Sequence, residues 1–250
     1  MIAAFSLETW LLAVLMGFGA ALYTSVGHAG ASAYLALMAL FGLPAQVMRP
    51  TALSLNILAG SVAAYRYMRA GLFSGRTLWP LLLGAAPMAF MGGAIQLPGH
   101  FYRPLVGIVL LAAAVRLLWP GAFKPWRDAT PMPIALGILA GASIGFLSGL
   151  TGTGGGIFLS PLLLFMGWSD ARTASGIAAA FILVNSIAGL SGNLASVQSL
   201  PAELPLFAAF VLIGTFVGTH LGIKRFAADA ILKALGVVLI VAGLKMLGLF

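Results

Sequence analysis

The sequence predicts an all-α polytopic membrane protein, built as an inverted repeat of five plus five helices. Three observations carry this prediction. First, 61% of the 250 residues are hydrophobic and only 7% are charged, which is typical of membrane proteins. Second, apolar runs long enough to cross a hydrocarbon core of roughly 30 Å follow one another along nearly the whole chain. Third, two glycine-rich breaks occur at corresponding positions of the two halves, each before a short apolar run.

Eight apolar runs have the length of a membrane-spanning helix. The residues before the first run include Glu8 and no basic cluster, and no small-residue cleavage site follows it, so we expect a retained span. The absence of cysteine excludes disulfides, thiolate metal sites and cysteine nucleophiles. The eight runs are Trp10–Val26, Thr51–Met68, Leu78–Leu97, Leu105–Trp119, Ile134–Leu150, Thr173–Leu190, Leu204–Leu221 and Ala230–Leu249.

Basic residues set the expected orientation, because the positive-inside rule places their clusters on the cytoplasmic side. The segment LSGNLASVQSLPAE (190–203) has no Lys or Arg, and we expect it on the outside together with the loop near Pro98. No basic face exists apart from the membrane segments, so nucleic-acid binding is not expected. The three basic clusters are Arg66, Arg69 and Arg76; Arg116, Lys124 and Arg127; and Lys224, Arg225 and Lys233.

A crossing is missing between the cytoplasmic loop near Lys124 and the outer segment near Asn193. An odd number is needed there, but only two full-length runs are present, so the short run Ile157–Trp168 must supply the third. As a helix this run is about 18 Å long, too short to cross alone. The stretch SGLTGTGGGIFLSP (148–161) must therefore complete the crossing as irregular backbone. Such backbone is tolerated at membrane depth only where it is buried in protein or lines a wet cavity.

The first half of the chain has the same layout as the second. A polar break over Ser25–Ser32 precedes another short run, Ala33–Leu43. A shift of 129 residues superposes LNILAG on VNSIAG, which matches Asn56 with Asn185. A shift of 125 residues superposes Gly27 on Gly152, Gly30 on Gly155 and Gly42 on Gly167.

We therefore expect one transporter domain over 1–250, with repeat 1 at about 8–120 and repeat 2 at about 131–249. Five crossings per half is an odd number, so the second repeat is inverted relative to the first. The chain then has ten transmembrane segments, or eight if the two short segments re-enter.

The two breaks predict a binding site for an anion. In an inverted repeat the short helices begin near mid-membrane, and their N-termini offer unpaired N–H groups, partial positive charge and room for a backbone nest. The five acids fall at segment ends or in loops, which argues against a cation carrier. The predicted substrate-binding residues are Gly27, His28, Gly30, Arg49, Asn56, Thr151, Gly152, Thr153, Gly154, Gly155, Gly156 and Asn185.

Structural explanations of the same residues stay open at this point. Glycines in membrane helices commonly allow close packing, and the amides of Asn56 and Asn185 are able to tie helices together. His28 also fits the role of a hydrogen-bonded interior histidine, and Arg49 that of a cation that snorkels to the interface.

Two stretches carry a family resemblance: GLTGTGGGIFLSPLLLFMGWSDARTASG and VGHAGASAYLALMALFGLPAQVMRPTALSLN. They resemble the paired signatures of the TauE/SafE family of sulfite and organosulfur-anion transporters, over roughly Trp10–Leu249. The first copy departs from the family's GxGGG pattern at His28, Ala29 and Ala31. The resemblance implies a multi-pass protein of the bacterial inner membrane that exports or takes up sulfite, sulfonates or sulfur-containing carboxylates.

The expected function is secondary transport of a small sulfur-containing anion by alternating access, with the lipid bilayer as surroundings and no cofactor or metal. His28 is the candidate proton carrier if uptake is proton-coupled. A passive anion channel is the alternative. An enzyme is not expected, because the chain lacks paired intramembrane acids, a His pair at i, i+4, and cysteine. No GxxxxGK[ST] motif indicates an ATP-driven pump, and the oligomeric state is not specified by the sequence.

Overall fold

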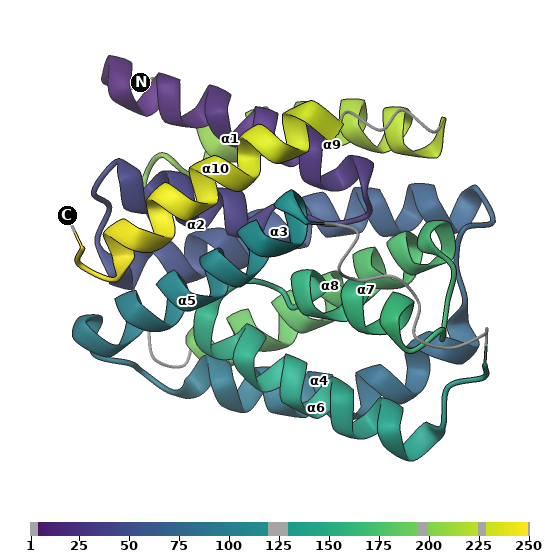
Figure 1. Ribbon diagram of the computed structural model, residues 1–250. Helices are drawn as coiled ribbons and strands as arrows, with labels where there is room; N and C mark the ends of the chain where they lie inside the picture. Colours follow the sequence, from purple (N-terminus) through teal and green to yellow (C-terminus); the bar gives the residue numbers. More distant parts are fainter. Residues whose placement is uncertain (1–4, 120–129, 195–199, 225–228, 250) are drawn as a thin grey trace.

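The computed structural model describes residues 5–119, 130–194, 200–224 and 229–249, and the regular structure within these ranges is helical (Figure 1). Six of the described helices are long and apolar enough to cross a membrane, which confirms the prediction of an all-α polytopic membrane protein. The basic positions Lys124, Arg127 and Arg225 lie outside the described residues. The helices are α1 (Leu7–Ser25), α2 (Ala31–Leu40), α3 (Ala45–Arg69), α4 (Gly75–Ala94), α5 (Gly99–Leu118), α6 (Ile134–Thr151), α7 (Gly156–Phe165), α8 (Ala171–Leu194), α9 (Leu204–Ile223) and α10 (Asp229–Met246).

Two of these helices, α2 and α7, are short and follow the glycine breaks as predicted. Each has ten residues, about 15 Å of helix. Both end three residues before the predicted boundary, because Gly42 and Gly167 turn the chain with positive φ angles of 75° and 66°. Both helices end in the same pair of backbone hydrogen bonds. After α2, the Gly42 N–H donates to the Ala39 carbonyl and the Leu43 N–H to the Met38 carbonyl. After α7, the Gly167 N–H donates to the Leu164 carbonyl and the Trp168 N–H to the Leu163 carbonyl.

The other matched glycines also share their backbone conformation. Gly27 and Gly152 have φ angles of 78° and 84°, and Gly30 and Gly155 have 103° and 82°. These values lie in the left-handed region. This conformation is unfavourable for a residue that has a side chain, but glycine adopts it without strain. The glycines that match at a shift of 125 residues in the sequence therefore also match in backbone conformation.

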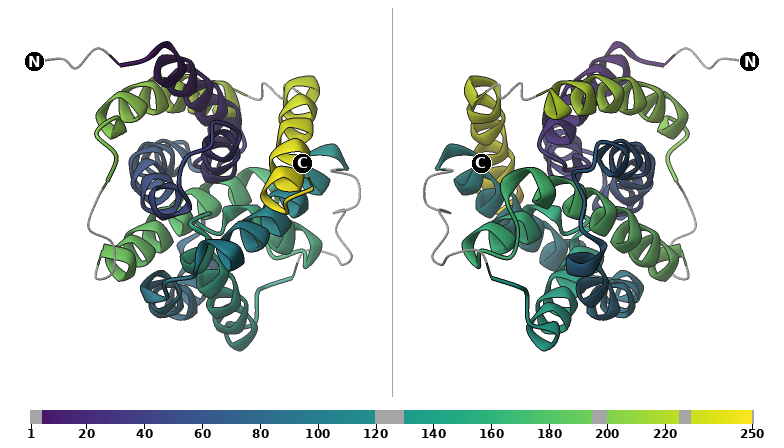
Figure 2. Two further views of the ribbon diagram at one scale, coloured as in Figure 1. Left: turned by 90° about the vertical axis from the view of Figure 1, so that its left-hand side faces the viewer. Right: turned by 90° about the vertical axis from the view of Figure 1, so that its right-hand side faces the viewer.

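Two pairs of parallel helices form opposite sides of the bundle. In Figure 1, α1 and α9 lie at the top and α4 and α6 at the bottom, and Figure 2 shows the same arrangement along the helix axes. The backbones touch in both pairs: a Cβ on Gly141 would lie 2.0 Å from the Leu81 carbonyl oxygen, and one on Gly214 would lie 2.0 Å from that of Gly17. Close packing is thus the role of these membrane glycines.

Helices α3 and α8 pack against each other between the two parallel pairs, and α5 packs against α10. In a repeat of five plus five, α1 corresponds to α6, α3 to α8, α4 to α9 and α5 to α10. Under this correspondence the α1–α9 pair becomes the α6–α4 pair, and the α3–α8 and α5–α10 pairs are each unchanged. A repeat predicts this symmetry of contacts. The inversion of the second half and the boundaries of the repeats stay predictions.

The buried core has two parts, each built around one short helix. Tyr34, Leu35 and Met38 of α2 are 0% exposed and belong to the first part. Leu159 and Leu163 of α7 are also 0% exposed and belong to the second part. The glycine break before each short helix is therefore held deep inside the protein.

Candidate functional site

The second glycine break runs over Gly152–Gly155 and leads directly into α7. Gly152, Gly154 and Gly155 all have left-handed φ angles, between 74° and 84°. Gly155 is the N-cap of α7, and no side chain caps this helix end. The helix N-terminus therefore presents backbone N–H groups and partial positive charge inside the protein.

Two asparagines approach this loop from different helices. Asn56 in α3 and Asn185 in α8 are both 0% exposed. A Cβ on Gly154 would lie 2.5 Å from Nδ2 of Asn56, and one on Gly155 would lie 3.2 Å from Nδ2 of Asn185. Only glycines allow the loop backbone to come this close to the two amides.

Neither amide has a hydrogen-bond partner within the described part of the chain, and the same is true of the Ser186 hydroxyl. Ser186 is also buried, and its Oγ would lie 3.2 Å from a Cβ on Gly154. We call Asn56, Asn185 and Ser186, together with Gly154 and Gly155, the amide cradle. The amides do not tie helices together as the structural explanation proposed, because they form no such bond among the described residues.

The two threonines of the break are buried but already engaged. The Oγ1 atom of Thr151 donates to the Leu147 carbonyl at 2.7 Å and lies 3.0 Å from Oγ1 of Thr153. The Thr151 carbonyl accepts a hydrogen bond from Tyr102 at 3.0 Å. These contacts fix the shape of the loop beside the amide cradle.

The first glycine break meets the second through His28, which is 2% exposed. Its Nδ1 atom lies 3.0 Å from the Val26 carbonyl, and its Nε2 atom lies 2.9 Å from the Gly156 carbonyl at the start of α7. The Nε2 atom is also 3.2 Å from the Ser160 hydroxyl and 2.6 Å from Nη1 of Arg116. Because Arg116 only donates, this contact assigns the proton to Nδ1 and the lone pair to Nε2.

Gly27 and Gly30 do not border the amides. A Cβ on Gly27 would lie 2.3 Å from the Ser175 carbonyl of α8, and one on Gly30 would lie 2.6 Å from the Tyr34 hydroxyl. These glycines let the first break pack tightly against its neighbours. Of the residues predicted in the first break, His28 is the one that reaches the second.

Arg49 does not snorkel to the interface, because its side chain is only 5% exposed. Its Nη1 atom donates to the carbonyls of Ile95 at 2.9 Å and Leu150 at 3.2 Å, and its Nη2 atom donates to that of Gly93 at 3.0 Å. With the Asn193 amide oxygen turned toward it, Nε also donates to that oxygen at 2.8 Å. These are carbonyls at the ends of α4 and α6, where a cation is favourable. Direct contact of Arg49 with a substrate stays a prediction.

Sequence reasoning missed Arg116, which it assigned to a cytoplasmic basic cluster. The residue lies in the last turn of α5, and its guanidinium contacts His28. Its position inside the apolar run Leu105–Trp119 was the available signal. Ser160 and Ser186 were also missed, although Ser186 directly follows Asn185 in the repeated VNSIAG motif.

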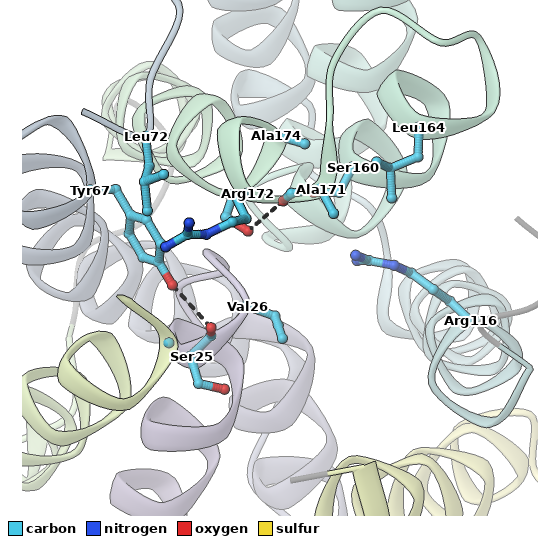
Figure 3. A pocket seen from close by; sticks show the side chains of 12 residues that line it. Ser25, Val26, Tyr67, Leu72, Arg116, Ser160, Leu164, Ala171, Arg172 and Ala174 are labelled. Carbon is cyan, nitrogen blue, oxygen red and sulfur yellow. Dashed lines mark hydrogen bonds between the residues drawn. The ribbon is translucent and has the colours of Figure 1, made fainter. Parts of the chain in front are cut away.

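A cavity of about 390 Å³ opens beside Arg116. We call it the cytoplasmic cavity, after the side of the membrane that the positive-inside rule predicts for its arginines. Figure 3 shows the Arg116 guanidinium directed toward the Ser160 side of this cavity, while Arg172 enters from the opposite wall beside Tyr67. Tyr67 donates to the carbonyls of Thr24 and Ser25, both at 3.0 Å. The polar residues of the lining are Ser25, Tyr67, Arg116, Ser160, Arg172 and Ser175.

Comparison with known proteins identifies the family. The sequence pattern described as sulfite exporter TauE/SafE matches residues 11–246. The chain belongs to the TauE/SafE family. This membership confirms the resemblance carried by the two glycine signatures and makes the chain a multi-pass membrane protein of a transporter family.

Two relatives of the TauE/SafE protein cover nearly its whole length. The "probable membrane transporter protein y4hK" of Sinorhizobium fredii is 36% identical over 229 residues, which is 90% of this chain and 92% of the relative. The "probable membrane transporter protein YjnA" of Bacillus subtilis is 26% identical over 253 residues, with 94% and 98% covered. No solved structure matches the chain significantly.

Proposed function

We propose that this TauE/SafE protein is a secondary transporter of a small sulfur oxyanion, such as sulfite or a sulfonate, in the bacterial inner membrane. The observation that carries the proposal is the amide cradle, in which Asn56 and Asn185 are fully buried without partners beside the start of α7. The family description as sulfite exporter and the names of the two relatives as probable transporters support it.

The chemistry of the amide cradle suits an anion. Each asparagine has two N–H donors, Ser186 has a hydroxyl, and the uncapped start of α7 adds backbone N–H groups. No carboxylate belongs to the cradle or to the described residues that contact it. A sulfur oxyanion has several acceptor oxygens spread around one centre, so it is able to pair with donors arriving from α3, α7 and α8 together.

The burial of the amide cradle favours a carrier over a passive channel. Asn56 and Asn185 are 0% exposed and Thr153 is 3% exposed, so this state is closed around the cradle. A channel needs a continuous wet path, whereas alternating access includes a closed state between its two open states. We propose that the closed state opens by movement of the α1–α9 side of the bundle relative to the α4–α6 side, because the glycine contacts hold each of these pairs together.

His28 is the proposed proton carrier for coupled uptake. With Arg116 turned away, a doubly protonated ring is able to donate from Nδ1 to the Val26 carbonyl and from Nε2 to the Gly156 carbonyl. The ionisable side chains facing the ring are Arg116 from α5 and Tyr23 from α1, whose ring centroid lies 6.2 Å away. Loss of the Arg116 contact would therefore favour protonation of His28.

Thermal stabilisation of the purified protein by sulfite, sulfate, thiosulfate, sulfoacetate, taurine and chloride tests the site. A ligand at about 100 times its Kd stabilises the folded state by about 2.7 kcal/mol. We expect one sulfur anion to raise the Tm, and Gly154→Ala to abolish this rise because its methyl group meets the Asn56 amide.

Gly71→Ala is the matched control, because Gly71 has a similar φ of 72° but open space around its Cβ position. Both alanines carry the same backbone penalty of about 1–2 kcal/mol. We expect the anion response to survive in Gly71→Ala. Equal responses in the two variants, or no response of the folded wild-type protein to any anion, would refute the proposed site.

A further inference from the structure

We propose that the cytoplasmic cavity is a second anion-binding site, in which Arg116 holds the oxyanion on the cytoplasmic side of the amide cradle. This inference rests on the proposed function, because it assumes that an anion passes between the two places. Binding here precedes the amide cradle during export and follows it during uptake.

The position of Arg116 is the first argument. Its guanidinium lies beside the cavity of about 390 Å³, which is enough for roughly a dozen water molecules or for a small oxyanion with part of its hydration shell. One of its five N–H groups meets His28. Among the described residues the guanidinium has no other hydrogen-bond partner, so its remaining donors are available to a ligand.

The second argument is the lack of an acidic partner. None of the three carboxylates whose side chains the structure describes, Glu8, Asp170 and Glu203, pairs with Arg116. Asp170, at the start of α8, accepts hydrogen bonds from the backbone N–H groups of Arg172 and Thr173. Glu8 and Glu203 lie at the beginnings of α1 and α9, whereas the cavity is lined by the ends of these helices. An arginine inside a membrane protein is paired with an anion or with backbone carbonyls, as Arg49 is. Arg116 has neither among the described residues, and a transported anion provides the partner.

The route from this cavity to the amide cradle is short. The Nε2 atom of His28 lies next to both Nη1 of Arg116 and the Gly156 carbonyl, and Gly156 directly follows Gly154 and Gly155 of the cradle. Between an oxyanion that takes the guanidinium away from His28 and the cradle, the contacts lead through His28 and Gly156. Arg116 therefore binds the anion at the cytoplasmic entrance, while Asn56 and Asn185 bind it at mid-membrane.

The test compares the two faces of the membrane. Inside-out vesicles from expressing bacteria present the cytoplasmic face to labelled sulfite, and right-side-out vesicles present the outer face. We expect Arg116→Gln to raise the KM for sulfite at least about tenfold in inside-out vesicles and by less than about threefold in right-side-out vesicles. Arg116→Lys keeps the charge and loses the planar fork, so we expect a smaller increase on the same face.

Arg69→Gln is the matched control, because it removes one positive charge from the same side at an exposed residue bonded to Tyr65. It is expected to leave both KM values within about twofold. An equal KM increase on both faces, an equal effect of Arg69→Gln, or unchanged KM values in both Arg116 variants would overturn the second site and leave the proposed function standing. If wild-type vesicles of neither orientation transport a sulfur anion, the proposed function itself fails. If Arg116→Gln does not insert into the membrane, Arg116→Lys tests the proposal: a KM increase in inside-out vesicles alone supports the second site, and equal KM values on both faces overturn it.

Discussion

Asn56 of α3 and Asn185 of α8 face one glycine loop from two helices, and neither amide has a hydrogen-bond partner among the described residues. They lie 129 positions apart in the sequence, at matched places of the repeated motif. A buried polar group without a partner costs about 1–3 kcal/mol of folding free energy. The two asparagines therefore lower the stability of the fold, and under the proposed function an anion that pairs with them raises it.

Replacing either asparagine with the similarly shaped leucine is expected to leave the Tm unchanged or raise it, while transport is lost. The reason is that Asn56→Leu and Asn185→Leu remove unpaired polar atoms, worth about 1 kcal/mol or more each. Thermal unfolding in detergent and sulfite uptake by proteoliposomes measure the two effects. Asn193→Leu is the control, because the Asn193 amide contacts Arg49 and its loss should lower the Tm. A similar loss of stability in all three variants would contradict the prediction.

Arg49→Met is expected to destabilise the fold by about 3 kcal/mol or more. The substitution leaves the buried carbonyls of Gly93 and Leu150 and the part-buried carbonyl of Ile95 without their donor. A chemical unfolding series in detergent measures the change. The exposed Arg69→Met should alter stability by less than about 0.5 kcal/mol. If the two variants are equally stable, the carbonyl contacts of Arg49 contribute little.

His28→Gln is expected to remove the dependence of uptake on an imposed pH gradient. Glutamine has no proton to release in this range, although it is able to keep a hydrogen bond with Arg116 or Gly156. Initial rates of sulfite uptake between pH 5.5 and about 8 measure the profile. Tyr23→Phe, which removes the other ionisable side chain facing the ring from α1, should leave the profile intact. An unchanged profile in His28→Gln would reduce His28 to a packing residue.

Asp170, at the start of α8, makes the stability of the fold depend on pH. Partial burial acts to raise the pKa of its carboxyl, but the Thr173 side chain and the backbone N–H groups of Thr173 and Arg172 outweigh this effect and lower the pKa. A lowered pKa in the folded state stabilises the protein above the unfolded value of about 3.9, and the contribution is lost as the pH falls further.

Asp170→Ala should therefore lower the stability by about 1 kcal/mol at pH 7, as for loss of a helix N-cap, and by less near pH 3.5. The Tm of both proteins measured across this range gives the difference. Glu203→Ala is a suitable comparison, because Glu203 makes no side-chain cap bond at the start of α9. A difference that does not shrink in acid would contradict the charged role of Asp170.

The matched glycines were predictable because glycine carries a local signal. A chain that turns with positive φ selects glycine whatever surrounds it, so the repeat in the sequence reappears as nearly equal φ angles at Gly27 and Gly152. The positive φ angles of Gly42 and Gly167 likewise set where each short helix ends. Asn56 and Asn185 were found through the repeat and through their rarity inside apolar runs.

Arg116 and the partners of Arg49 were not predictable in this way. An arginine near the end of an apolar run and before further basic residues has the pattern of an orientation signal. Its contact with His28, 88 positions away, depends on how α5 packs against the first break. In the same way, the carbonyls held by Arg49 come from α4 and α6 and become available only where those helices end.

The glycine contacts along the two parallel pairs also limit how the protein is able to move. Gly141 and Gly149 meet Leu81 and Ala89 at backbone distance, and Gly214 meets Gly17 in the same manner, so neither partner is free to slide or rotate without a collision of main chains. Each pair therefore moves as one rigid unit, which we call a strut. The flexible joints of the molecule must lie elsewhere, where side chains separate the helices, and the struts transmit any displacement at one membrane face to the other without absorbing it.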